Sequence, residues 1–144
     1  MGERVIPASA PLVYSRLADY RNHHPNFLPP EFSDFEVESG GLGAGTQFAV
    51  TFTIMGRSQA DRMRVDEPEH GRVLRERSLS TDLTTTFTVE PRGDSCQVTI
   101  ETTWTRGWLR GLLERWLAVP AIRKIYAREL VLLEEYVTGD GAEG

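Results

Sequence analysis

The chain has 144 residues, of which 40% are hydrophobic and 26% are charged, and its formal net charge is −5. This length and composition predict one domain that can build a core without disulfides. The single cysteine, Cys96, excludes an internal disulfide and is typical of a reducing compartment, so we expect a cytoplasmic protein. The acidic balance argues against nucleic-acid binding, and the sequence has no apolar run long enough for a signal peptide or an integral membrane segment.

The first thirty residues predict a short strand followed by two short helices. Residues 3–6 form the expected strand. Ser9 suits the N-cap of a helix that continues to about residue 20. A second short helix is predicted over residues 22–28. The two prolines that follow it directly must end it.

From residue 35 onward the hydrophobic pattern changes to a period of two, which is the strand period. It is clearest in residues 48–54, where Phe and Val alternate with Ala and Thr. Short turns rich in Gly, Pro and Asp separate the later strands, which are expected over 58–67, 72–79, 83–90 and 95–104. Such short links predict antiparallel neighbours.

The C-terminal part predicts one long amphipathic helix over residues 107–137. Its apolar residues recur at spacings of three and four, which is the helical period; they are Trp108, Leu112, Trp116, Val119, Ile122, Tyr126, Leu130, Leu133 and Val137. Pro120 lies inside this pattern, so we expect a break, or a bend of more than about 20°, near residues 116–121. Residues 139–144 are expected to form a flexible tail after a single domain of residues 1–138.

This order of elements predicts an α+β helix-grip fold. A curved antiparallel sheet of six or seven strands would wrap around the long C-terminal helix, with two short helices between the first and second strands. The chain resembles the START-like or SRPBCC superfamily, which includes polyketide cyclases, lipid-transfer domains and plant pathogenesis-related allergens. The stretches that carry the resemblance are residues 5–10, 18–20, 24–29 and 43–46, followed by the closing helix. Residues 24–29 are also similar to bacterial coenzyme-Q-binding members.

A fold in which a sheet grips a helix often encloses a ligand cavity between the two. We expect the inward-facing aromatic and apolar side chains, with two threonines, to bind the ligand. These candidates are Phe48, Phe52, Met63, Thr85, Phe87, Thr102, Trp104, Trp108, Trp116 and Tyr126.

Two carboxylates are candidates for proton transfer in this cavity. If Met63 faces inward, the strand period sends Asp61 inward too. In the next strand one parity turns Leu74, Glu76 and Ser78 inward, and the other turns Val73, Arg75, Arg77 and Leu79 inward. The pattern leaves both open, and either one puts a charge in or near the interior. Asp61 and Glu76 are therefore the catalytic candidates if the protein is an enzyme. The alternative for Asp61 is a position in solvent near a strand end.

Other chemistry finds little support in the sequence. The glycines of residues 40–45 precede a strand rather than a helix, so they favour a bent turn over a phosphate loop. His23 and His24 are adjacent and have no further ligands in a metal-binding spacing, so we expect no metal site. The resemblance to the START-like superfamily allows His24 to lie near a cavity mouth, but a surface position is favoured. Cys96 has no local pattern of a nucleophile. We expect no cofactor.

The favoured hypothesis is a binding protein for a small, mainly hydrophobic molecule such as a lipid, a quinone or a polyketide. Whether the protein is an enzyme is left open. The first alternative is an enzyme that resembles polyketide cyclases and aromatases, which need no cofactor. The second is an interaction module of the co-chaperone or stress-response type without a ligand. The sequence is compatible with a monomer or a homodimer.

Overall fold

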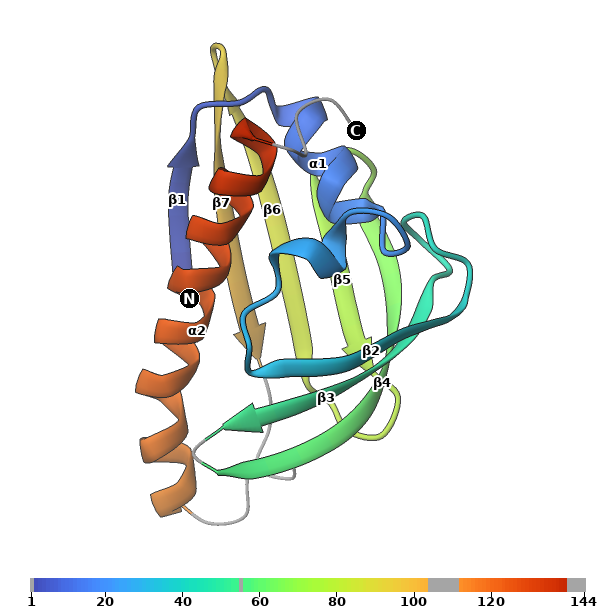
Figure 1. The fold of residues 1–144 in the computed structure, drawn as a ribbon, viewed down its shortest axis with the longest axis vertical. Helices are drawn as coiled ribbons and strands as arrows, with labels where there is room; N and C mark the ends of the chain where they lie inside the picture. Colours follow the sequence, from blue (N-terminus) through green and yellow to red (C-terminus); the bar gives the residue numbers. More distant parts are fainter. Residues whose placement is uncertain (1, 55, 104–111, 140–144) are drawn as a thin grey trace.

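Seven strands form one antiparallel sheet in the order β1-β7-β6-β5-β4-β3-β2. The computed structural model describes residues 2–54, 56–103 and 112–139, with side chains from residue 120 onward in the last range. The strands are β1 (Gly2–Ile6), β2 (Phe32–Ser39), β3 (Gln47–Ile54), β4 (Arg57–Glu69), β5 (Val73–Ser78), β6 (Thr84–Arg92) and β7 (Ser95–Thr103). The sheet bends strongly, so that β2 and β3 run across in front of the other strands (Figure 1).

Three helical segments lie on the concave side of the sheet, as the helix-grip prediction requires. They are α1 (Ala10–Ala18), the 3₁₀ helix η1 (His24–Phe27) and α2 (Leu112–Thr138). Figure 1 shows α2 along the β1 side of the sheet, with α1 and η1 between its C-terminal half and β5. Contacts join α2 to β1, η1 and α1. The α+β fold class and the seven antiparallel strands are thus confirmed.

The chain between α1 and β2 is shaped by local hydrogen bonds. Ser9 caps α1 by accepting a hydrogen bond from the amide of Leu12 at 3.4 Å. After α1 the carboxylate of Asp19 accepts hydrogen bonds from the amides of Arg21 at 3.2 Å and Asn22 at 2.9 Å. This Asx turn reverses the chain, so that η1 returns toward the sheet and turns His24 inward.

The inward parity of β5, which the sequence left open, is the one that includes Glu76. Leu74, Glu76 and Ser78 are buried, whereas Arg77 is exposed. Arg75 faces the opposite side and donates a hydrogen bond from Nε to Asp66 Oδ1 at 2.9 Å. The ladder places Glu76 opposite Thr85 of β6, and Thr85 opposite Thr102 of β7. A row of polar side chains therefore crosses the apolar inner face of the sheet.

The long helix forms as predicted over its described part, but it does not break at Pro120. The helix is continuous from Leu112 to Thr138, and residues 107–111 of the expected span lie outside the described residues. The expected break is therefore wrong, while a bend stays a prediction. Pro120 is exposed, and it has no backbone N–H to donate within the helix.

Candidate functional site

A cavity opens between the inner face of the sheet, η1 and α2. Its volume is about 80 Å³. On the same measure, a cavity that holds one water molecule needs roughly 10–15 Å³. Most of its lining is apolar, with a minority of polar side chains. The lining residues are His24, Leu28, Phe32, Phe35, Phe48, Val50, Phe52, Gln59, Asp61, Met63, Glu76, Leu83, Thr85, Phe87, Tyr126 and Glu129.

Most of the described candidates from the sequence come together at this cavity. Asp61 and Glu76 line it, as do the apolar and hydroxyl candidates Phe48, Phe52, Met63, Thr85, Phe87 and Tyr126. Thr102 lies just behind the lining, where its hydroxyl hydrogen-bonds to that of Thr85 at 2.9 Å and to that of Tyr126. Trp104 and Trp108, and the side chain of Trp116, lie outside the described part of the chain.

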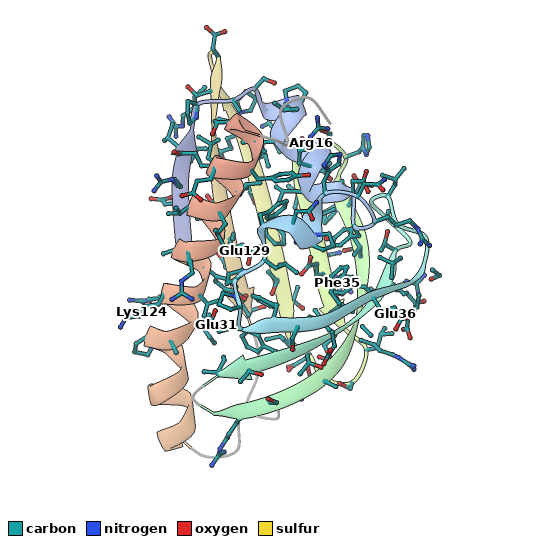
Figure 2. All side chains as sticks on the ribbon, in the orientation of Figure 1. Arg16, Glu31, Phe35, Glu36, Lys124 and Glu129 are labelled. Carbon is teal, nitrogen blue, oxygen red and sulfur yellow. The ribbon has the colours of Figure 1, made fainter. Side chains whose placement is uncertain are left out.

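Three ionisable side chains converge at the end of the cavity nearest α2 and η1. Glu76 Oε2 and Glu129 Oε2 each lie 4.0 Å from His24 Nε2, which is too far for a hydrogen bond. The Tyr20 hydroxyl donates to Glu76 Oε2 at 2.7 Å, while Glu129 Oε2 is buried and has no hydrogen-bond partner among the described residues. Figure 2 shows Glu129 on the side of α2 that faces the sheet, while Phe35 approaches from β2. We call His24, Glu76 and Glu129 the polar cluster.

Burial controls the protonation of this cluster. Desolvation raises the pKa of Glu76 to about 7, although the hydrogen bond from Tyr20 opposes the rise. Desolvation also raises the pKa of Glu129 well above its usual range, and the negative charge of Glu76 adds to the effect. Desolvation lowers the pKa of His24 to about 4. Near neutral pH the histidine is therefore uncharged, and Glu76 titrates in the physiological range.

His24 lies in the cavity wall, whereas the sequence analysis favoured a surface position over one near the cavity mouth. Its side chain is 2% exposed, and Nδ1 donates a hydrogen bond to the Leu17 carbonyl at 2.6 Å. This bond fixes the tautomer and leaves Nε2 as an acceptor that faces the two carboxyl groups. The ring also stacks on Tyr20, with centroids 4.6 Å apart. The carbonyl partner and the stacking offset the cost of burial, and neither could be seen in the sequence.

Glu129 is the residue of the cluster that the sequence analysis missed. It lies three residues after Tyr126 and four before Leu133, so the helical period puts it on the same inward stripe. A charged residue within an apolar stripe was therefore the available signal. Tyr20 was missed as well, because its role depends on the hydrogen bond to Glu76 across the fold.

Asp61 sits in a different environment from the polar cluster. It is half-buried, and the adjacent lining residue Gln59 is exposed, so this end of the cavity meets solvent. Its carboxylate accepts hydrogen bonds from the Ser78 hydroxyl at 2.7 Å and the Ser80 hydroxyl at 2.8 Å. Asp61 is thus held by neutral donors near the opening, whereas Glu76 lies in the interior.

The described part of the chain contains neither a metal-binding cluster nor a membrane-spanning helix. Its His, Cys, Asp and Glu residues include no group of three or more that could hold a metal ion. Its helices include none that is both long and apolar enough to cross a membrane.

The sequence profile of the polyketide cyclase/dehydrase and lipid transport family matches residues 2–138. The chain belongs to this family. Among solved structures, the KanY protein (ms6282) is 26% identical with a TM-score of 0.84, and the match covers 96% of this chain and 95% of that chain. TTHA0849 from Thermus thermophilus is 25% identical with a TM-score of 0.73, over 93% of this chain and 92% of that chain.

The family's fold also occurs in an aromatase/cyclase of known structure. The Zhui aromatase/cyclase from Streptomyces sp. R1128 is 19% identical with a TM-score of 0.65, over 99% of this chain and 92% of that chain. At this identity the likeness concerns the fold alone. A comparison with curated proteins found no match.

Proposed function

We propose that the protein binds a small, mainly apolar molecule in the cavity between the sheet and α2. The observation that carries the proposal is the cavity itself, which is large enough for more than a single water and is lined mostly by Phe, Leu, Val and Met side chains. The polar cluster at one end would orient a polar group of the ligand. Membership of a family of cyclases and lipid-transport proteins agrees with such a ligand.

A cavity-filling variant tests the binding function. Val50 lines the cavity from β3, whereas its neighbour Ala49 faces the other side of the sheet. We expect Val50→Phe to weaken the binding of an apolar fluorescent probe at least tenfold, and Ala49→Phe to leave it unchanged. Native mass spectrometry of the purified protein would identify a co-purified ligand. If the wild-type protein binds no probe and carries no ligand, the interaction-module alternative replaces this proposal.

An acid–base enzyme that acts on an aromatic polyketide is the second candidate. It is favoured by the convergence of Glu76, Glu129 and His24 in an apolar cavity, since a carboxyl group whose pKa is about 7 can accept and return a proton near neutral pH. Glu76 would be the proton-transfer group, and uncharged His24 Nε2 would accept a hydrogen bond from the substrate.

Kinetics separate this enzyme from a binding protein. In the enzyme, Glu76→Gln would lower kcat by orders of magnitude with little change in KM, because a proton-transfer group acts mainly on the transition state. Asp61→Asn would have a smaller effect, since Asp61 lies near the solvent end. The absence of turnover of aromatic polyketides by the wild-type protein would reject the enzyme and leave the binding function standing.

A further inference from the structure

The ionisable lining of the cavity is acidic. Asp61, Glu76 and Glu129 line it, and no Lys or Arg is among the described lining residues. The cation nearest in sequence to Glu129 is Arg128, which instead donates to the surface carboxylate of Glu31 at 3.1 Å. Lys124 is exposed on α2 (Figure 2). Within the described part of the chain, the buried acids are therefore not compensated by a basic side chain.

When Glu76 is ionised, the polar cluster offers more hydrogen-bond acceptors than donors, because a proton kept by Glu129 would be its one donor. The Nδ1 hydrogen of His24 is already used by the Leu17 carbonyl, so Nε2 presents a lone pair. Glu129 also lines the cavity, and its Oε2 is buried without a hydrogen-bond partner in the part of the chain that the structure describes. The Tyr20 hydroxyl is a nearby donor, and it is already engaged by Glu76. The missing complement is therefore a group with several N–H or O–H donors placed between Glu76 and Glu129.

The walls next to the cluster are aromatic. His24 packs against Phe87 with ring centroids 5.6 Å apart, and Tyr20 stacks on Phe48 at 5.1 Å. Phe35 stacks on Phe48 in turn, with centroids 4.8 Å apart. Aromatic ring faces attract cations, and they attract them more strongly when the site is desolvated.

We propose that this cavity selects an apolar molecule that ends in a protonated amine, and that it rejects the same molecule when it ends in a carboxylate. The ammonium group would donate to the ionised carboxylate of Glu76, which is a charge-assisted acceptor, and to the buried Oε2 of Glu129. A carboxylate at the same place would meet two carboxyl groups and no described cation. This inference rests on the proposed binding function and specifies the head group of the ligand.

Amine binding should depend on pH, because it changes the protonation of Glu76. In the free protein, burial raises the pKa of Glu76 to about 7, so below that pH the carboxyl group must release its proton when the ammonium group arrives. The other groups that face the pair are His24 on η1, Tyr126 on α2, Tyr20 before η1 and Asp61 on β4. His24 is uncharged above about pH 5, because its pKa is lowered to about 4. Ionisation of Glu76 therefore couples amine binding to pH near neutrality.

A series of compounds with one body and different head groups provides the test. The probes are 4-phenylbutylamine, 4-phenylbutanol and 4-phenylbutyrate, and their affinities for the full chain are measured by calorimetry at pH 6 and pH 8. We expect the amine to bind at least about tenfold more tightly than the alcohol at pH 8, with the carboxylate weakest. The amine should lose about tenfold in affinity at pH 6, because a smaller fraction of Glu76 is ionised there. The affinity of the alcohol should not depend on pH.

Three variants locate the effect. Glu76→Gln and Glu129→Gln keep the side-chain shape and remove the ionisable group. The control is Glu135→Gln, which changes an exposed position of α2, the helix that carries Glu129. Amine affinity in Glu76→Gln should fall to that of the alcohol and lose its pH dependence. Glu129→Gln should weaken the amine, and Glu135→Gln should leave it unchanged. Urea unfolding of each variant establishes that it is folded.

The outcomes separate this inference from the proposed function. If the alcohol binds as tightly as the amine at pH 8, or if the preference for the amine survives both cluster variants, the amine inference is wrong and the binding function stands. If none of the three compounds binds and the apolar probe does not bind either, the inference and the proposed function both fail.

Discussion

The substitution Glu76→Gln gives the sharpest test of the electrostatics of the cavity. The amide has the shape of the carboxyl group and can still accept the hydrogen bond that the Tyr20 hydroxyl donates at 2.7 Å. The substitution therefore removes only the ionisable group. Because the folded-state pKa of Glu76 is raised, its contribution to stability is fully present below its ordinary pKa of 4.5 and is lost as the pH rises to about 7. The variant does not suffer this loss.

The size of the effect follows from the pKa. The rise from 4.5 to about 7 spans about 2.5 pH units, and each unit is worth about 1.36 kcal/mol. The variant should therefore gain about 3 kcal/mol relative to the wild-type protein between pH 4 and pH 8. The charge of Glu76 also raises the pKa of Glu129, so its removal adds to the gain in the same direction. The titration of His24 occurs in both proteins and cancels in the comparison.

Urea unfolding at several pH values between 4 and 8 measures this difference. At pH 4 the two proteins should have nearly equal free energies of unfolding. At pH 8 the variant should be more stable by about 3 kcal/mol, which corresponds to roughly 10 °C in Tm for a chain of this size. The exposed Glu135→Gln variant is the control and should show no such trend. A difference that stays within about 1 kcal/mol across this range would refute the buried, proton-binding state of Glu76.

Two further predictions compare matched positions. Phe52 is half-buried in the cavity lining, so Phe52→Ala should destabilise the protein by less than about 3 kcal/mol, whereas Phe27→Ala, at a core position 1% exposed, should cost about 3–5 kcal/mol in the same urea assay. Equal costs would mean that Phe52 is tightly packed core. Gly43→Ala should cost more than Gly71→Ala. Both glycines have positive φ, but a Cβ at position 43 would clash with Glu67 Oε1, while a Cβ at position 71 meets open space. The Glu67 carboxylate cannot move away freely, because it accepts hydrogen bonds from the Tyr14 hydroxyl at 2.6 Å and the Ala44 amide at 2.9 Å. Equal Tm values for these two alanine variants would refute the steric argument.

The sequence pattern predicted the frame of the fold because burial of apolar residues leaves a periodic signal. The alternation in residues 48–54 and the three-four spacing of α2 each report which face is covered. The period of two could not tell which face of β5 points inward, because charged residues lie on both of its faces. The pairing of β5 with β6 and the burial of Leu74 show that the face with Glu76 points inward. Patterning thus located the cavity walls but not the orientation of Glu76.

The polar cluster could not be predicted in full, because its members are held by long-range contacts. His24 is buried since the Leu17 carbonyl satisfies Nδ1 and Tyr20 stacks on the ring. The Tyr20–Glu76 hydrogen bond joins residues far apart in the sequence. Glu129 alone left a local signal, as an acid on the apolar stripe of α2. Polar residues in a core are specified by partners, and hydropathy carries no information about partners.

The polar cluster links the stability of the empty protein to ligand binding. Above about pH 7 the fold must hold Glu76 ionised in the interior, next to a buried Glu129 whose Oε2 has no hydrogen-bond partner among the described side chains. Both features lower the free energy of unfolding. A ligand that donates hydrogen bonds to these oxygens removes the same penalty. Binding to the folded chain alone then raises its stability with ligand concentration. The groups that make the empty cavity costly are therefore those that favour a ligand with a donor at this end.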